Sequence, residues 1–229
     1  MTELINYLAA TYYLILLSLA LSILAMFYSF QTEIDRLKPL RAYLIVYSIG
    51  LVLNMIYAAT NRLTFIISKL LAFEDFAFTV FEIFVFTGIL YKYISDRISK
   101  VIIKSIIAIY VAIIAALCIA FFNHNTENTL LVQKSYLIQA IAMLIITSIY
   151  FFDTFRNPLK NDVSNEPAFW VASAISLCLV CTIPATMLII FSNGKDRSTL
   201  TGMYGIIHIF YGVLFVLLIR AFRCKPSFT

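Results

Sequence analysis

Seven long apolar segments dominate this sequence and constrain its fold more than any other feature. They cover about residues 5–29, 41–60, 76–94, 102–122, 133–153, 168–191 and 199–219, and polar stretches separate them. About 20 apolar residues in an α-helix cross the hydrocarbon core of a bilayer, which is about 30 Å thick. We therefore predict an all-α integral membrane protein, a single seven-helix bundle over residues 1–229.

The composition indicates that lipid is the solvent of this chain. Hydrophobic residues make up 62% of it and charged residues 13%, and the mean hydropathy is +0.93. Soluble domains have roughly 25% charged residues. The first apolar segment follows Met1-Thr-Glu-Leu, which carries no positive charge. We therefore expect this segment to be retained as a helix and not removed as a signal peptide.

The distribution of Lys and Arg predicts the orientation in the membrane. Seven spans alternate direction, so the breaks between them fall on two opposite sides. Of the 17 basic residues, twelve fall on the side of the C-terminus and five on the side of the N-terminus. Because cytoplasmic loops are enriched in Lys and Arg, we predict an N-terminus outside and a C-terminus in the cytoplasm.

Several classes of function lack sequence support. The net charge of +5 does not indicate nucleic-acid binding, because the basic residues sit at segment ends. Cys178-x-x-Cys181 has no second pair of ligands, so apolar packing explains it better than a metal or redox site. The apolar segments contain no His-x-x-x-His pattern, paired carboxylates or Gly-rich phosphate loop. We predict a non-enzymatic protein with no catalytic residue, metal site, cofactor or nucleic-acid partner.

Two ionisable side chains lie deep within apolar segments: Glu82 in the third and His208 in the seventh. Such a group costs about 2.5–3.5 kcal/mol at the bilayer centre on insertion scales, so it must face the bundle interior or water. On the predicted topology Glu82 falls in the outer half of its span and His208 near the middle. The two could hydrogen bond to each other, titrate, or bind a cation or polar ligand. The alternative is interhelical packing, in which each side chain bonds a neighbouring hydroxyl.

Other polar side chains fall at a similar depth in the outer half of their spans. They are Thr11, Tyr12, Tyr13, Asn54, Tyr57, Gln139, Thr182 and Tyr204. Any one of them alone is explained by packing, but their shared depth predicts a polar cavity open to the outside. We select Glu82, His208, Asn54, Tyr57, Gln139, Tyr12 and Tyr204 as candidate ligand-binding residues.

A shift of 126 residues aligns the second segment with the sixth and the third with the seventh, and it brings Glu82 onto His208. Identities such as Ile83-Phe84 with Ile209-Phe210 support the alignment, whereas the first and fifth segments need a gap. The pattern suggests two three-helix units joined by the fourth segment, a 3+1+3 arrangement known in some transporters. Chance similarity between apolar sequences is the alternative explanation.

Short motifs suggest a family. They are Phe-Glu-Ile-Phe around Glu82, Glu166-Pro-Ala-Phe-Trp170 at the start of the sixth segment, Tyr211, and the basic stretch from Arg220 to Lys225. In these motifs the chain resembles small, mostly uncharacterised bacterial seven-helix proteins, which are similar to the membrane-embedded sensory regions of some histidine kinases. The resemblance implies a sensory role in the cell (inner) membrane, with Glu82 and Trp170 matching the pattern. Because the chain ends at Thr229, we expect any signal to pass to a separate cytoplasmic partner.

The leading hypothesis is therefore a sensor or receptor-like membrane protein that binds an unknown small ligand or a proton in an outer cavity. A second hypothesis is a small-molecule or ion transporter of 3+1+3 architecture, which the internal similarity favours. A third is a structural membrane subunit, in which the polar residues only hold helices together.

Overall fold

The computed structural model describes residues 2–32, 34–60, 65–123, 129–156, 163–192 and 197–224. These residues form seven α-helices and two short 3-10 helices, and no strand occurs among them. The elements are α1 (Thr2–Gln31), η1 (Asp35–Leu37), α2 (Lys38–Thr60), α3 (Phe65–Tyr91), α4 (Arg97–Asn123), α5 (Thr129–Arg156), η2 (Val163–Asn165), α6 (Pro167–Phe191) and α7 (Arg197–Arg223). The predicted all-α fold is confirmed, and each predicted segment lies on a different α-helix.

Helix α3 departs most from its predicted segment, because it begins at Phe65 and not near residue 76. The polar pair Glu74 and Asp75 indicated a break at this point, but the helix runs through both residues. Asp75 Oδ1 accepts a hydrogen bond from the hydroxyl of Tyr136 on α5, at 2.7 Å. A carboxylate that finds a donor inside the bundle does not have to leave the helix to be solvated.

Five described helical stretches are long and apolar enough to cross a membrane. They are Tyr12–Gln31, Arg97–Asn123, Leu130–Arg156, Pro167–Phe191 and Gly202–Arg223. Large apolar side chains point away from the bundle: Phe191 is 77% exposed and Ile98 is 70% exposed, while Glu82 and Gln139 are buried. Soluble monomers rarely expose apolar patches of this extent. The described helices thus have the character of a helical membrane protein.

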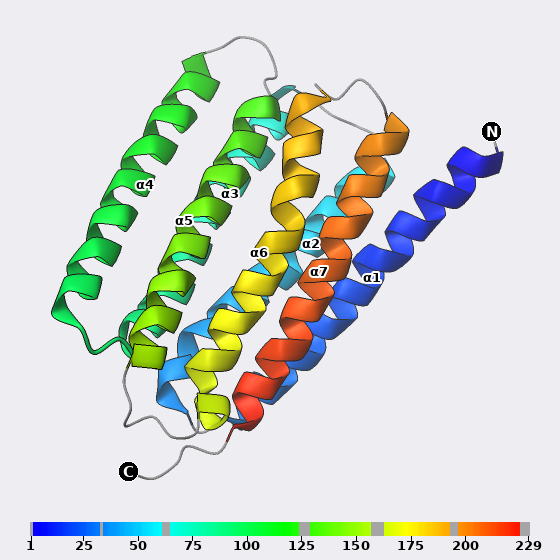
Figure 1. Ribbon diagram of the computed structural model, residues 1–229. Helices are drawn as coiled ribbons and strands as arrows, with labels where there is room; N and C mark the ends of the chain where they lie inside the picture. The colour runs from blue at the N-terminus through cyan, green and yellow to red at the C-terminus, as the bar shows by residue number, and fades with distance from the viewer. Residues whose placement is uncertain are drawn as a thin grey trace.

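The seven α-helices pack side by side in one bundle (Figure 1). Helices α1, α3, α5 and α7 begin at the end of the bundle where the N-terminus lies, which we call the N-terminal end, and α7 finishes at the opposite, C-terminal end. Helix α7 packs between α1 and α6, and α5 packs against α3, α4 and α6. Helix α4 lies at one edge against α3 and α5, so the other six helices surround the centre.

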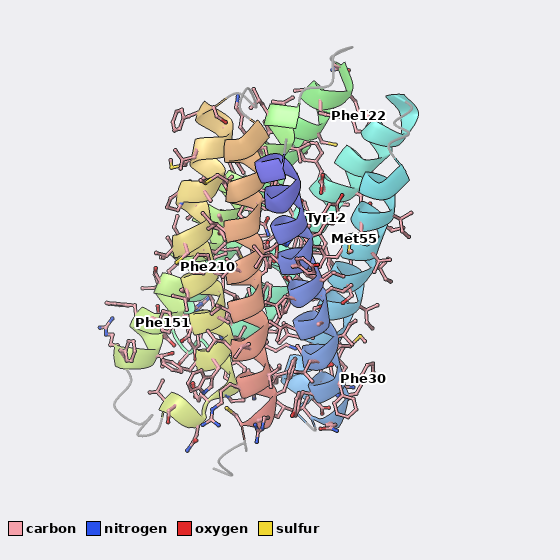
Figure 2. The ribbon with its side chains drawn as sticks, turned by 90° about the vertical axis from the view of Figure 1, so that its right-hand side faces the viewer. Tyr12, Phe30, Met55, Phe122, Phe151 and Phe210 are labelled. Carbon is pink, nitrogen blue, oxygen red and sulfur yellow. The ribbon has the colours of Figure 1, made fainter. Side chains whose placement is uncertain are left out.

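Small polar side chains link neighbouring helices inside this bundle. The hydroxyls of Ser22 on α1 and Ser48 on α2 lie 2.9 Å apart, and Ser176 on α6 donates to Thr147 on α5 at 2.9 Å. Bonds of this kind hold helices together where the surrounding lipid offers no hydrophobic driving force. Aromatic side chains such as Phe30, 59% exposed, lie on the outside (Figure 2).

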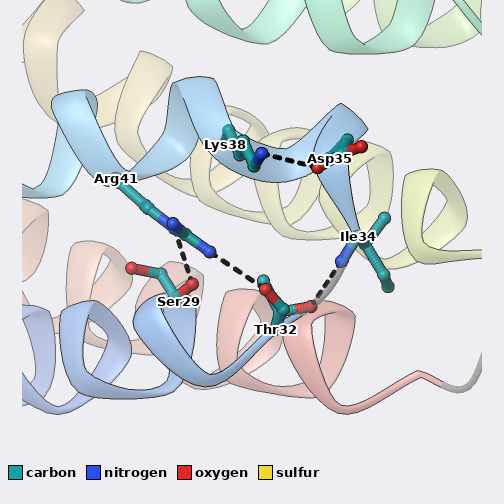
Figure 3. Close-up of polar contacts among 6 residues, drawn as sticks. All are labelled: Ser29, Thr32, Ile34, Asp35, Lys38 and Arg41. Atoms are coloured by element: carbon teal, nitrogen blue, oxygen red, sulfur yellow. Dashed lines mark hydrogen bonds and ion pairs between the residues drawn. The ribbon is translucent and has the colours of Figure 1, made fainter.

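The turn between α1 and α2 fixes the antiparallel packing of these two helices (Figure 3). Arg41 donates from Nε to the carbonyl oxygen of Ser29 at 2.7 Å and from a terminal nitrogen to that of Thr32 at 2.9 Å. The last carbonyls of a helix have no hydrogen-bond partner within it and carry partial negative charge. A guanidinium supplies both hydrogen-bond donors and positive charge at this end. Lys38 also pairs with Asp35 at 2.6 Å on the exposed side of the turn.

Candidate functional site

A cavity of about 440 Å³ lies in the centre of the bundle, and six of the seven α-helices line it. Its described lining residues come from the first half of α1, from about the first half of α5, and from the middle parts of α2, α3, α6 and α7. The cavity is therefore centred near the middle of the bundle, and its lining on α1 and α5 is displaced toward the N-terminal end. Helix α4 contributes none of the described lining residues.

Glu82 is the most deeply buried charged side chain of this site, with 6% of its surface exposed. Its Oε1 accepts a hydrogen bond from the hydroxyl of Tyr43 on α2 at 2.9 Å, and its Oε2 accepts one from Nε2 of Gln139 on α5. A buried carboxylate is tolerated only where such donors replace water. Glu82 thus ties α3 to α2 and α5 at the wall of the cavity.

Two further carboxylates line the cavity, and the sequence reasoning missed both. Asp75 accepts from Tyr136, as described above, and Glu74 lies next to Gly50 of α2. A Cβ atom at Gly50 would lie 3.5 Å from Glu74 Oε1, so the glycine leaves space beside this carboxylate. The sequence pattern places both acids in a polar break between apolar segments. The apolar residues that precede Glu74 belong to the same helix, and they are the feature of the sequence that indicates a helix running through both acids.

His208 lines the cavity from α7, but it is not among the hydrogen-bond partners of Glu82. The Glu82 oxygens accept from Tyr43 and Gln139 instead. Among the described residues, His208 Nδ1 has no hydrogen-bond partner although it is buried. The two side chains share one cavity while remaining on different walls, because α3 and α7 each pack mainly against other helices.

Of the four remaining candidate ligand-binding residues, two line the cavity and two have side chains outside the described part of the chain. Tyr12 of α1 lines it, as does Met55 of α2, and both are labelled in Figure 2. Tyr204 of α7 also lines it, and its hydroxyl accepts from Nε2 of Gln133 at 3.1 Å. Asn54 and Tyr57 belong to α2, but their side chains lie outside the described part of the chain. Ligand binding by any of these residues remains a prediction.

Aromatic rings form much of the wall between the polar groups. The rings of Tyr47 on α2 and Tyr211 on α7 stack with centroids 5.3 Å apart, and Phe78 of α3 lies 6.2 Å from Tyr47. The hydroxyl of Tyr47 lies 3.2 Å from that of Ser18 on α1. These contacts join α1, α2, α3 and α7 along the aromatic wall of the cavity.

The described lining residues thus combine carboxylates, amides, an imidazole and tyrosine hydroxyls with apolar and aromatic side chains. This is the usual composition of a small-molecule site, in which a few polar groups orient a ligand within apolar walls. Within the described part of the chain, no three His, Cys, Asp or Glu side chains lie close enough to bind one metal ion. No protein-family model, curated protein or solved structure matches the chain. The function is therefore inferred from this cavity and its surroundings.

Proposed function

We propose that this protein is a non-enzymatic sensor or receptor-like membrane protein that binds a small ligand in the central cavity. The cavity is the observation that carries the proposal, because a ligand inside it would contact up to six helices at once. A ligand shifts a conformational equilibrium when it binds one arrangement of the helices better than another. Because six helices line the site, many ligand contacts can differ between two arrangements of the helices.

The proposed topology has seven spans in the cell (inner) membrane, with the cavity facing outside and the C-terminus in the cytoplasm. Helices α2 and α3 have 23 and 27 residues and lie parallel to the five apolar ones, which supports seven crossings. Basic side chains collect at the C-terminal end, where Arg36 lies 5.0 Å from the ring centre of Tyr93 and Arg223 6.0 Å from that of Tyr28. Basic residues beside interfacial aromatic rings are typical of the cytoplasmic boundary of a membrane protein.

Helices α6 and α7 provide a route from the cavity to this C-terminal end. Both line the cavity, through residues such as Thr182 and His208. At the other end, the guanidinium of Arg220 on α7 lies 5.5 Å from the ring centre of Trp170 on α6. The indole of Trp170 also donates to the carbonyl oxygen of Ser164 at 2.7 Å. A movement of α7 against α6 would change this pair, where a cytoplasmic partner would detect it.

Trp170 is the sole tryptophan of the chain, so in a nanodisc with a tryptophan-free scaffold protein its fluorescence reports on this end alone. The experiment places the purified full-length protein in lipid nanodiscs and titrates it with a library of small polar and charged compounds. A sensor should show a saturable change in Trp170 emission together with a higher melting temperature. Gly50→Leu, which fills the cavity beside Glu74, should abolish both effects, whereas Ile98→Leu on the outer face of α4 should abolish neither.

The proposal fails if no compound changes the melting temperature or the emission, and if Glu82→Gln leaves cellular signalling intact. Stabilisation by a ligand without any change at Trp170 would argue for a binding protein that does not transmit a signal. Such a result would separate ligand binding from the receptor-like role.

A small transporter of 3+1+3 architecture is the second candidate, and the packing supplies a specific observation in its favour. The shift of 126 residues relates α2 and α3 to α6 and α7, and by extension α1 to α5. If α1, α2 and α3 correspond to α5, α6 and α7, each contact should have a counterpart. The α1–α2 contact has its counterpart in α5–α6, and the α1–α7 contact has its counterpart in α5–α3. A two-fold axis parallel to the helices requires such matched pairs. Substrate uptake into liposomes, lost in Glu82→Gln, would favour this candidate over a sensor.

A further inference from the structure

The cavity carries an imbalance of charge that indicates the class of its ligand. Three carboxylate side chains are among its described lining residues, Glu74, Asp75 and Glu82, whereas neither Lys nor Arg is among them. Carboxylates away from water are ordinarily paired with a positive group, since the cost of removing both from water is otherwise not offset. The described walls of this cavity supply no such group except the imidazole of His208.

The carboxylates retain capacity to accept hydrogen bonds from a ligand. Each oxygen of Glu82 accepts one described hydrogen bond, from Tyr43 or from Gln139. A carboxylate oxygen has two lone pairs, so one on each oxygen stays open. Asp75 accepts at Oδ1 from Tyr136, which leaves Oδ2. An ammonium group, which donates up to three hydrogen bonds and accepts none, matches this set of acceptors.

The aromatic wall favours the same charge. Tyr47, Phe78 and Tyr211 all line the cavity, and the ring centre of Tyr47 lies 5.3 Å from that of Tyr211 and 6.2 Å from that of Phe78. The face of an aromatic ring carries negative potential and attracts a cation within about 6 Å of its centre. Carboxylates beside aromatic rings therefore offer both a counter-charge and a surface for an alkylated ammonium group.

The size of the cavity restricts the ligand further. At roughly 30 Å³ for each water-sized group, a volume of about 440 Å³ corresponds to a small molecule of about 15 non-hydrogen atoms. The apolar side chains of Leu51, Met55 and Ile207 also line it and would contact a hydrocarbon body. The described His, Cys, Asp and Glu side chains do not converge on one point as metal ligands do, which favours an organic cation over a metal ion.

We propose that the cavity binds a small organic cation, a primary or alkylated amine with an apolar body. This inference rests on the proposed function, because it names the chemical class of the ligand for the same site. The carboxylates of Glu74 and Asp75 pair with the ammonium group, Glu82 adds negative charge about 10 Å further along α3, and the aromatic and aliphatic side chains enclose the rest of the molecule.

The test uses three probes with the same phenyl body and different charge: phenethylamine, phenylpropionate and phenethyl alcohol. The full-length protein in nanodiscs is titrated with each, and the melting temperature and Trp170 emission are recorded. The amine should give saturable stabilisation, and the other two should give little. Asp75→Asn should weaken the apparent affinity for the amine about tenfold or more, because the ammonium group loses the counter-charge of the carboxylate. Asp35→Asn is the matched control, since it removes an exposed carboxylate in η1, outside the cavity.

Glu74→Gln serves as a second variant in case Asp75→Asn does not fold. Equal stabilisation by the anion or the alcohol would overturn the inference, and so would amine affinity that is unchanged in both carboxylate variants. If the anion or the alcohol binds and Gly50→Leu blocks it, the cavity is still a ligand site and the proposed function stands without the cation. Absence of saturable stabilisation by the amine also overturns the inference, whereas the proposed function is tested separately by the response to the whole library and by Glu82→Gln.

Discussion

Removing one hydroxyl, that of Tyr43, tests whether Glu82 is held in place as the structure indicates. Tyr43 is fully buried, its hydroxyl donates to Glu82 Oε1 at 2.9 Å, and its ring lies 4.7 Å from that of Phe86. Tyr43→Phe keeps the ring and removes only the donor. After the change, Gln139 is the one donor among the described contacts of Glu82. The substitution therefore isolates a single hydrogen bond to a buried carboxylate.

The expected cost follows from the charge on the acceptor. Interhelical hydrogen bonds measured in a membrane average about 0.6 kcal/mol. Hydrogen bonds to a charged group contribute about 1.5–3 kcal/mol, and the loss of one leaves the buried carboxylate with a single partner. For a chain of this size each kcal/mol lowers the melting temperature by roughly 2–4 °C, so we expect Tyr43→Phe to lower it by roughly 3–12 °C.

The assay is thermal unfolding of the purified protein in nanodiscs, with Tyr110→Phe as the matched control. Tyr110 is also buried, at 1% exposed, but its hydroxyl has no hydrogen-bond partner among the described residues. Its removal should be neutral or stabilising, because an unpaired buried hydroxyl is unfavourable. A double-mutant cycle of Tyr43→Phe with Glu82→Gln should show a coupling of about 1 kcal/mol or more. Equal shifts for the two Tyr→Phe variants, or a coupling of zero, would refute the reasoning.

Three further predictions concern stability elsewhere in the bundle. Asp153, buried on α5, accepts hydrogen bonds from the backbone N–H groups of Ser95 and Asp96 at 2.9 and 3.1 Å. Asp153→Ala should therefore lower the free energy of unfolding by about 1.5–3 kcal/mol, measured by chemical unfolding, with Arg156→Ala at an exposed residue as its control. Hydrogen bonds from the backbone N–H and hydroxyl of Ser99 hold the pKa of the Asp96 carboxyl below its ordinary value of 3.8. This stabilisation is complete above pH 3.8 and is lost as the pH falls through the lower folded pKa, so a pH titration of the melting temperature should show a fall at acid pH that Asp96→Asn reduces. Gly50→Ala should raise the melting temperature slightly, because alanine is more favourable than glycine in a helix interior by about 0.8–1 kcal/mol. The added Cβ would lie at ordinary contact distance from Glu74. A lower melting temperature would contradict this prediction.

The sequence by itself determined the helices and the depth of their polar side chains. Apolar length sets the number of helices and their approximate bounds, since a segment of about 20 such residues is stable in lipid only as a helix. Because a helix advances 1.5 Å per residue, position in a segment also gives depth. For this reason Glu82, His208, Gln139, Tyr12 and Tyr204 could be assigned to one level before their neighbours were known, and all five line the cavity.

Only the tertiary structure decided which of these groups meet. A contact between helices depends on their order in the bundle and on the rotation of each about its axis, and helices that are apolar on most sides present no distinct face from which to infer either. Glu82 therefore bonds Tyr43 and Gln139, while His208, expected as its partner, does not bond it. The carboxylates of Glu74 and Asp75 join the cavity because packing against α2 and α5 places them inside the bundle, although their polarity had indicated a break.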